Sequence, residues 1–459
     1  FYFTTHSNIV AMKKMQTSNF STNFRWIHDR CRRRLRRVRH VALNCVKATS
    51  MTLGLIVFAL GSPGQAWAAN LPSGATVVHG VVDLQQQGND ALRILQGSQS
   101  AIVNWQSFDI GAGALVDIVQ PNIDSALLSR IVGGNPSEIL GSLNANGHLF
   151  LVNPNGIIFG KDSTVDVHAL IASTLDIADS AFLSGNISFT GDSDAAVINL
   201  GSINAESFAA LIGGKVSNDG SITAPGGDAA LLAADAILEV GEASGGKITL
   251  DLSGLLGGTA DSSGSIDVAS STTQGGSATI LGEQVAVSGT VDASGATGGG
   301  LVLIGGDYQG QNTNLANAQT TNISGTISAD SFLNGDGGRV IIWADGVTTF
   351  TGDLSATGSG SGGFAEVSGK NILNFEGSVD LSSASGVSGT LLLDPTNITI
   401  SNVGSHTSIS GSTTLEPSAA AGSVISLSTL NTALASNNVI IQTSAGGGSE
   451  TGNISVDSG

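Results

Sequence analysis

"GGRVIIWADGVTTFTGDLSATG" (residues 337–358) contains three short runs of strand-forming residues, separated by turns that carry glycine. Val, Ile, Thr and Phe dominate these runs, and such residues favour strands. The segments "GGSATILGEQVAVSGTVDASG" (275–295) and "GGFAEVSGKNILNFEGSVDLSSASG" (362–386) follow the same plan. The glycine pairs recur from Gly275 to Gly299 and from Gly337 to Gly362, and imperfect repeats with a step of roughly 25 residues predict a solenoid in which each unit forms one coil.

The predicted fold class is all-β, a right-handed parallel β-helix with an N-terminal cap. Strands of successive coils would stack about 4.8 Å apart, with alternate apolar side chains filling the axis. The part of this 459-residue chain that follows position 68 predicts about 16–19 coils of roughly 20–25 residues each. The open ends of such a stack are exposed strand edges, so a cap is expected within residues 69–225. No segment shows a sustained helical period, which argues against helices.

The net charge of −18 combines a basic N-terminal segment with an acidic remainder. Eleven of the 18 Lys and Arg residues lie in residues 1–47, whereas 35 of the 36 acidic residues lie beyond position 68. The part of the chain from residue 69 onward therefore carries 35 negative and 7 positive side chains. Such a surface repels phosphate backbones, so nucleic-acid binding is excluded as a function.

The N-terminal segment, residues 1–68, is predicted to be a signal peptide. A basic run (25–40) precedes an apolar stretch (51–60) that is too short to span a bilayer, and a small–x–small pattern follows. Cleavage is expected between Ala68 and Ala69. The first methionine is Met12, so residues 1–11 are interpreted as upstream translation. No later apolar run is long enough for a transmembrane helix, and the two cysteines both lie in this leader.

One polar turn interrupts two apolar runs in "LFLVNPNGIIFG" (149–160). Pro154 has its φ preset, and Asn155 and Gly156 tolerate turn conformations, so residues 153–156 are predicted to form a tight corner between strands. The shorter sequence "GNPS" (134–137) also contains an Asn-Pro pair. The residues alone leave two roles open for the corner, one in folding and one in recognition.

These motifs resemble the secretion domain of two-partner secretion exoproteins, the filamentous-haemagglutinin-like large adhesins. The resemblance rests on "IVNWQSFDIGAGALVDIVQP" (102–121), "LLSRIVGGNPSEILGSLNANGHLFLVNPNGIIFG" (127–160) and "LIASTLDIADSAFLSGNISF" (170–189). It implies export across the outer membrane to the medium or cell surface, after recognition by the periplasmic domains of a dedicated β-barrel transporter. It also implies a secretion motif at Asn153, Pro154, Asn155, Gly156 and Ile157, with Asn135 and Pro136 as a possible second motif.

The resemblance divides the chain into a signal peptide (1–68), a β-helical secretion domain (69–330) and the truncated start of a repeat solenoid (331–459). The implied function is that of a large adhesin, whose ligand on a host or neighbouring cell the sequence does not identify. An alternative within the family is the delivery rod of a contact-dependent toxin or a cytolysin.

A β-helical polysaccharide-active enzyme is the alternative from another class. Such an enzyme needs paired carboxylates and usually aromatic sugar platforms, but the carboxylates are scattered singly and aromatic residues make up 5% of the chain. The histidines outside the leader show no metal-ligand spacing: His79, His148, His168 and His406. "NGDGG" (334–338) occurs once, without the period of calcium-binding repeats. No enzymatic activity, metal or cofactor is therefore expected.

Overall fold

The computed structural model describes residues 70–185, 187–234, 238–243, 247–251, 257–402, 422–443 and 452–457. The predicted signal peptide, its cleavage site at Ala68 and Ala69, both cysteines and His406 lie outside the described residues. Among the described residues, no helix has the length and apolar character needed to cross a membrane.

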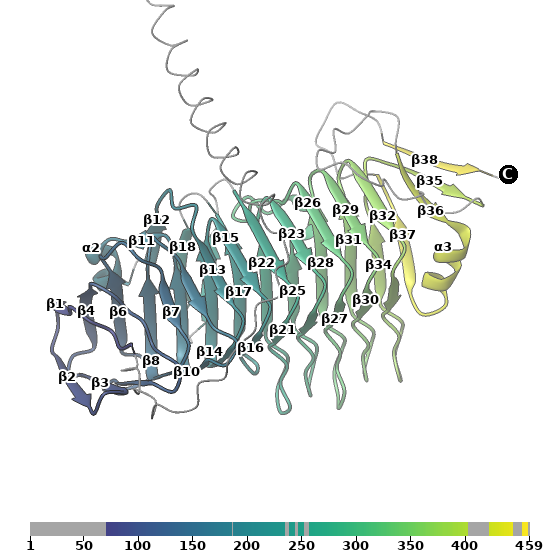
Figure 1. Cartoon of the computed structure of the whole chain (residues 1–459). Helices are drawn as coiled ribbons and strands as arrows, with labels where there is room; N and C mark the ends of the chain where they lie inside the picture. The colour runs from purple at the N-terminus through teal and green to yellow at the C-terminus, as the bar shows by residue number, and fades with distance from the viewer. Residues whose placement is uncertain are drawn as a thin grey trace, which may run out of the picture. The chain divides into compact units, whose positions relative to one another are not determined.

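The strands stack side by side as successive coils of a parallel β-helix (Figure 1). In the repeat region each coil contributes a strand to face A, then to face B, then to face C. Ser277 pairs with Leu301 one coil later, and Arg339 pairs with Phe364, so neighbouring coils have the register that the glycine pairs predict. The all-β solenoid prediction is confirmed.

Three faces run along the stack, and three long strands bend from face C into face A. Face A comprises β4 (Ser100–Trp105), β6 (Ala126–Ile131), β17 (Asp228–Ala233), β22 (Ser277–Leu281), β25 (Leu301–Ile304), β28 (Arg339–Ala344), β31 (Phe364–Gly369), β34 (Thr390–Leu393) and β37 (Asn438–Ile441). Face B comprises β7 (Ser137–Ile139), β9 (Ile157–Phe159), β13 (Ala196–Asn199), β15 (Lys215–Asn218), β20 (Thr259–Ser262), β23 (Gln284–Val287), β26 (Thr320–Ile323), β29 (Val347–Phe350), β32 (Ile372–Phe375), β36 (Ser423–Ser426), β35 (Asn397–Ser401) and β38 (Asn453–Asp457). Face C comprises β3 (Ala91–Gln96), β5 (Leu115–Val119), β16 (Ser221–Thr223), β21 (Ser265–Asp267), β24 (Thr290–Asp292), β27 (Thr326–Ser328), β30 (Asp353–Ser355) and β33 (Ser378–Asp380). The bent strands are β8 (Ser142–Val152), β10 (Thr164–Ser173) and β14 (Ser202–Gly213).

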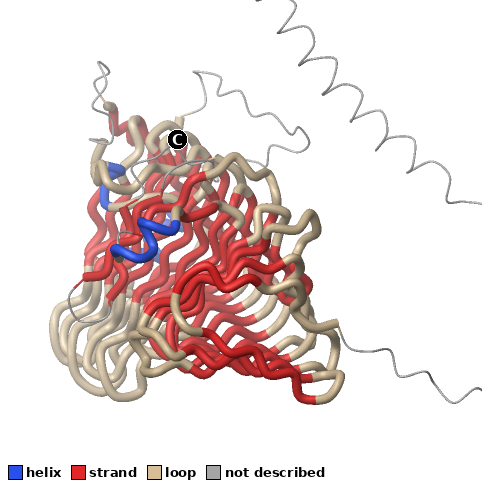
Figure 2. The backbone as a smooth tube through the Cα atoms, turned by 90° about the vertical axis from the view of Figure 1, so that its left-hand side faces the viewer, coloured by secondary structure: helices blue, strands red, loops and turns tan. Residues whose placement is uncertain are grey.

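Apolar side chains fill the axis of the stack, and Figure 2 views the coils from the N-terminal end. Strands of faces B and C alternate between buried and more exposed residues, as in β23 and β24. Face A differs, because every residue of β17 after Asp228 is buried. Continuous burial of this kind means that face A is covered on both sides.

A small antiparallel sheet covers part of the outer side of face A. Its strands are β11 (Asp176–Ile177), β12 (Ile187–Thr190), β18 (Leu238–Ala243) and β19 (Lys247–Asp251), and the helix α2 (Asp179–Ser184) connects the first two. Phe182 of α2 packs edge-on against Phe150 of β8, with 5.2 Å between the ring centroids. This contact belongs to a second apolar cluster, separate from the axis.

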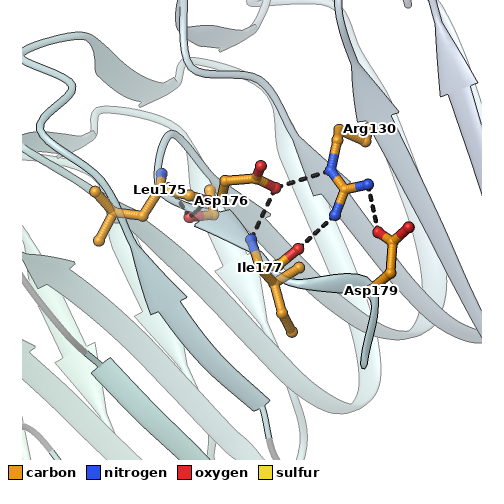
Figure 3. A network of polar contacts seen from close by, with 6 residues as sticks. Arg130, Leu175, Asp176, Ile177 and Asp179 are labelled. Carbon is orange, nitrogen blue, oxygen red and sulfur yellow. Dashed lines mark hydrogen bonds and ion pairs between the residues drawn. The ribbon is translucent and has the colours of Figure 1, made fainter. Parts of the chain in front are cut away.

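Arg130 of β6 fastens this lateral sheet to the coils (Figure 3). Its guanidinium donates to Asp176 at 2.8 Å, to Asp179 at 2.6 Å, and to the carbonyl oxygen of Ile177. Burial acts to lower the pKa of Arg130, but the hydrogen bonds with Asp179 and Asp176 raise it above its ordinary value. One side chain thus holds both the start of α2 and the strand before it.

Arg130→Met is expected to loosen the lateral sheet, because methionine keeps the apolar stem and removes all three donors. The free energy of local opening should fall by about 1–3 kcal/mol, since a hydrogen bond to a charged group contributes in that range. Hydrogen exchange of peptides from residues 175–190 measures the effect. Arg93→Met is the matched control: its ion pair with Asp117 is exposed, and its loss should cost less than about 1 kcal/mol. Equal hydrogen-exchange protection of residues 175–190 in the two variants would contradict this role of Arg130.

Antiparallel strands cap the N-terminal end of the stack, as predicted. β1 (Thr76–His79) pairs antiparallel with β4, and β2 (Val82–Gln87) pairs antiparallel with β3. Leu71, Ala75 and Val82 pack against the axial core from this end. The cap therefore extends the hydrogen-bonded sheet beyond the first coils, but with antiparallel strands in place of parallel ones.

Two expectations from the sequence were wrong. Face B contains 12 strands within the described residues, fewer than the roughly 16–19 coils expected. The difference arises because several segments leave the coils to cover face A, namely residues 174–185, 187–195, 238–243, 247–251 and 305–319. Helices also occur: α2, and α3 (Leu427–Leu434), where the Ser426 hydroxyl accepts a hydrogen bond from the Thr429 N–H and caps the first turn.

Candidate functional site

The predicted secretion motif forms the corner where the chain passes from β8 on face A to β9 on face B. Asn153 is fully buried at the end of β8, and Ile157 begins β9 within the axial core. Pro154 and Asn155 are exposed. Gly156 has φ of 118°, a conformation that L side chains rarely adopt. The motif therefore has inward-facing and outward-facing members.

Asn153 uses its side-chain amide to fix the corner. Its Nδ2 donates to the carbonyl oxygen of Asn135 and to the hydroxyl of Ser137, both at 3.0 Å. Its Oδ1 accepts from the backbone N–H of Asn155 at 3.0 Å. A buried amide with three contacts is a structural element of the turn.

The second Asn-Pro segment lies directly against the first, one coil earlier. The Asn155 side chain donates to the carbonyl oxygen of Gly133 at 2.8 Å, and the Ser137 N–H donates to the carbonyl oxygen of Gly156 at 2.9 Å. A Cβ on Gly156 would lie 3.5 Å from that of Pro136. The structure thus brings together Asn135, Pro136 and residues 153–157, which the sequence proposed as separate motifs.

The outward side of this stack forms a small exposed surface, which we call the NP corner. It consists of Val132, Asn135, Pro136, Pro154 and Asn155, with the Val132 side chain 50% exposed. The sequence did not single out Val132. It also missed the next coil, from which the Ser193 hydroxyl donates to the carbonyl oxygen of Pro154 at 2.6 Å.

A second candidate site is a groove of about 830 Å³ where the bent strands turn from face C to face A. Its lining includes a row of polar side chains from successive coils: Asp117, Asn144, Asp166 and Asn204. The lining also includes Asn146, His168 and Glu206.

Coil stacking brings together two of the histidines that show no metal-ligand spacing in the sequence. The rings of His148 and His168 stack with centroids 5.7 Å apart. His168 also contacts Glu206, with 2.9 Å between Nδ1 and Oε2. Within the part of the chain that the structure describes, no group of three or more His, Cys, Asp or Glu residues could hold a metal ion.

A third polar cluster lies under residues 305–319, which we call the strap. Glu366 of β31 and Asp394 after β34 are both fully buried on the outer side of face A. The Gln309 N–H of the strap donates to Glu366 at 3.0 Å, and its side chain donates to Asp394 at 3.0 Å. Burial, with a further contribution from Asp394, raises the pKa of Glu366 to about 7.

Comparison with known proteins matches the N-terminal coils to a secretion domain family. The TPS secretion domain family matches residues 68–262. Two heme/hemopexin-binding proteins of Haemophilus influenzae are each 37% identical to this chain, over 169 and 129 residues. The matched segments cover 35% and 28% of this chain, and 18% and 14% of the relatives. The chain thus spans less than a fifth of the length of these curated relatives.

A solved structure matches a larger part of this chain than these relatives do. The HMW1 secretion domain from Haemophilus influenzae is 29% identical, with a TM-score of 0.50, and the match covers 70% of this chain and all of that one. The family match and the fold both agree with the resemblance that the motifs within residues 102–189 indicate. Residues 68–262 therefore match the TPS secretion domain family, and the predicted resemblance to two-partner secretion exoproteins is confirmed.

Proposed function

We propose that this chain is the N-terminal part of a large exoprotein that a dedicated outer-membrane transporter exports to the medium or cell surface. The observation that carries the proposal is the match of residues 68–262 to the TPS secretion domain family, together with the capped β-helix formed by the described residues of this region. A solenoid suits this route, because coils can form one after another on those already folded.

We assign recognition by the transporter's periplasmic domains to the NP corner. Asn153 and Ile157 face inward and serve folding. Pro136 and Pro154 are exposed on neighbouring coils, so their rings are accessible to the transporter. Under this assignment the motif has two roles, divided by the direction in which each side chain points.

Export of the chain with and without its transporter tests the proposal. The double variant Pro136→Ser, Pro154→Ser should reduce secreted protein at least tenfold while the purified protein unfolds at nearly the wild-type denaturant concentration. The control is the double variant Leu140→Ser, Leu200→Ser, which changes two exposed apolar residues. These residues follow β7 and β13, at the ends of the face B strands opposite the NP corner, and the variant should be exported normally. Export without a transporter would overturn two-partner secretion. Normal export of the double proline variant would overturn only the role of the NP corner.

The coils continue across residue 330 without a break, since β27 pairs with β30 and β28 with β31. We propose that the part of the chain from residue 331 onward begins an adhesive rod that projects from the cell and contacts a host or neighbouring cell. The boundary at 330 is a proposal about function, not a break in the fold. Delivery of a toxin or cytolysin by the same rod is the alternative.

A catalytic role in the groove is disfavoured by how its carboxylates are engaged. Asp117 pairs with Arg93 at 3.3 Å, Asp166 accepts from Asn204 at 2.8 Å, and Glu206 contacts His168. Each carboxylate thus has a neighbour on an adjacent coil. A pair poised for acid–base cleavage needs one member kept protonated and the other free to react. We therefore propose a non-enzymatic exoprotein.

A further inference from the structure

The groove between faces C and A has a geometry that repeats once per coil. Asn144 of β8 pairs in register with Asp117 on one side and Asp166 on the other, and Asp166 pairs with Asn204. The row therefore alternates carboxylate and amide at the strand spacing of about 4.8 Å. The feature is independent of the NP corner, which lies at the opposite end of the face A strands.

Three further lining residues of the groove have the same kind of chemistry. Asn146, His168 and Glu206 come from the three bent strands, one from each coil. The Asn146 amide exchanges hydrogen bonds with the backbone of Gln120, at 2.7 and 3.0 Å, so its orientation is fixed. His168 is held by Glu206 and by its stack on His148. Asn146 and His168 are thus held in place before a ligand arrives, which lowers the cost of binding.

Asn144 lies in the middle of the groove with its side chain unengaged. No described residue hydrogen-bonds to its amide, although carboxylates occupy the same position on both neighbouring coils. The amide offers two donors and one acceptor to an incoming ligand. Planar carboxylates and amides can each contact two adjacent hydroxyl groups of a sugar.

We propose that this groove binds a neutral, extended polysaccharide along the axis of the coils. The spacing of about 4.8 Å matches one pyranose unit of an extended glycan, whereas two residues of an extended peptide span about 6.6 Å. Asp117, Asp166 and Glu206 accept hydrogen bonds from hydroxyl groups and repel anionic polymers. The inference goes beyond the proposed export and does not depend on it.

Isothermal titration of the full chain with three probes tests this inference. A neutral β-linked glucose hexamer should bind, and the corresponding trimer should bind at least tenfold more weakly, because it reaches fewer coils. A galacturonate hexamer should not bind. Asn144→Ala should weaken hexamer binding at least tenfold while leaving the unfolding midpoint unchanged, since this side chain has no partner within the described fold.

Asp292→Ala is the matched control. Asp292 continues the same row beyond the groove, through the pairing of Asn204 with Thr223, Thr223 with Asp267 and Asp267 with Asp292. Its replacement should leave hexamer affinity unchanged. Absence of hexamer binding, equal weakening by Asp292→Ala, or tighter binding of an oligolysine peptide than of the hexamer would overturn the proposal. Release of new reducing ends would overturn a pure binding role and favour a polysaccharide-active enzyme.

Discussion

Asn153→Ala should lower the free energy of unfolding at the corner between β8 and β9 by about 3 kcal/mol. The change removes the buried donors to Asn135 and Ser137 and the acceptor for the Asn155 N–H. Each lost hydrogen bond contributes about 1 kcal/mol, and buried backbone groups left without a partner add to the cost. Hydrogen exchange of peptides covering residues 149–160 measures the loss, which corresponds to roughly 100-fold faster exchange.

Pro154→Ala is the control for this effect, because it changes the same turn at an exposed position. Removing the ring affects mainly the unfolded chain, so the expected cost is below about 1 kcal/mol. If Asn153→Ala exchanges no faster than Pro154→Ala, the buried amide does not hold the corner. Poor export of Asn153→Ala alone would then contradict the assignment of Asn153 to folding.

The two Asn-Pro segments could have been brought together from the sequence alone. Pro136 and Pro154 are separated by the length of one short coil. In a solenoid, residues one coil apart are neighbours. The periodicity is clearest beyond residue 225, where the coils are longer, so this relation was missed.

The lateral sheet also left a signal in the sequence. A strand exposed on one side alternates apolar and polar residues, whereas "RVIIWA" (339–344) and "DAALLA" (228–233) are continuously apolar after their first residue. Both segments belong to face A, which is covered on its outer side. The pattern predicts a cover, but it does not identify the segment that supplies it. Arg130 and Asp179 are far apart in the chain, and only the fold places them together.

The groove and the strap lay beyond sequence reasoning for a different reason. Inserted segments vary the number of residues per coil, so the register between distant positions cannot be counted along the chain. Gln309 and Glu366 are distant in sequence, yet they are joined by one hydrogen bond because the strap folds back over face A. The carboxylates that looked scattered are ordered by strand pairing.

The strap makes stability depend on pH through Glu366. The pKa of this buried carboxyl is about 7 in the folded chain, against an ordinary value of 4.5 in the unfolded chain. The folded state therefore holds the proton more tightly, and stability falls as pH rises from about 4.5 to 7, then stays low. The loss amounts to about 3 kcal/mol above pH 7, because one pKa unit corresponds to about 1.4 kcal/mol.

Glu366→Gln should remove this dependence, since glutamine keeps the shape and the acceptor for the Gln309 N–H but carries no charge. At pH 8 the strap peptides of residues 305–319 should exchange roughly 100-fold more slowly in the variant than in the wild type, and equally fast at pH 4.5. Comparing the two proteins at one pH cancels the intrinsic pH dependence of exchange. The exposed Glu283→Gln is the control and should match the wild type at both pH values.

The second carboxylate oxygen of Glu366 explains why this effect should be large. Its Oε1 is buried. Burial, the largest cause, and the nearby Asp394 raise the pKa of this carboxyl, and they outweigh Gln309, Ser368 and Arg339, which lower it. If residues 305–319 exchange equally fast in the wild type and in Glu366→Gln at pH 8, water or an ion must reach that oxygen. The strap would then not exclude solvent from Glu366 and Asp394.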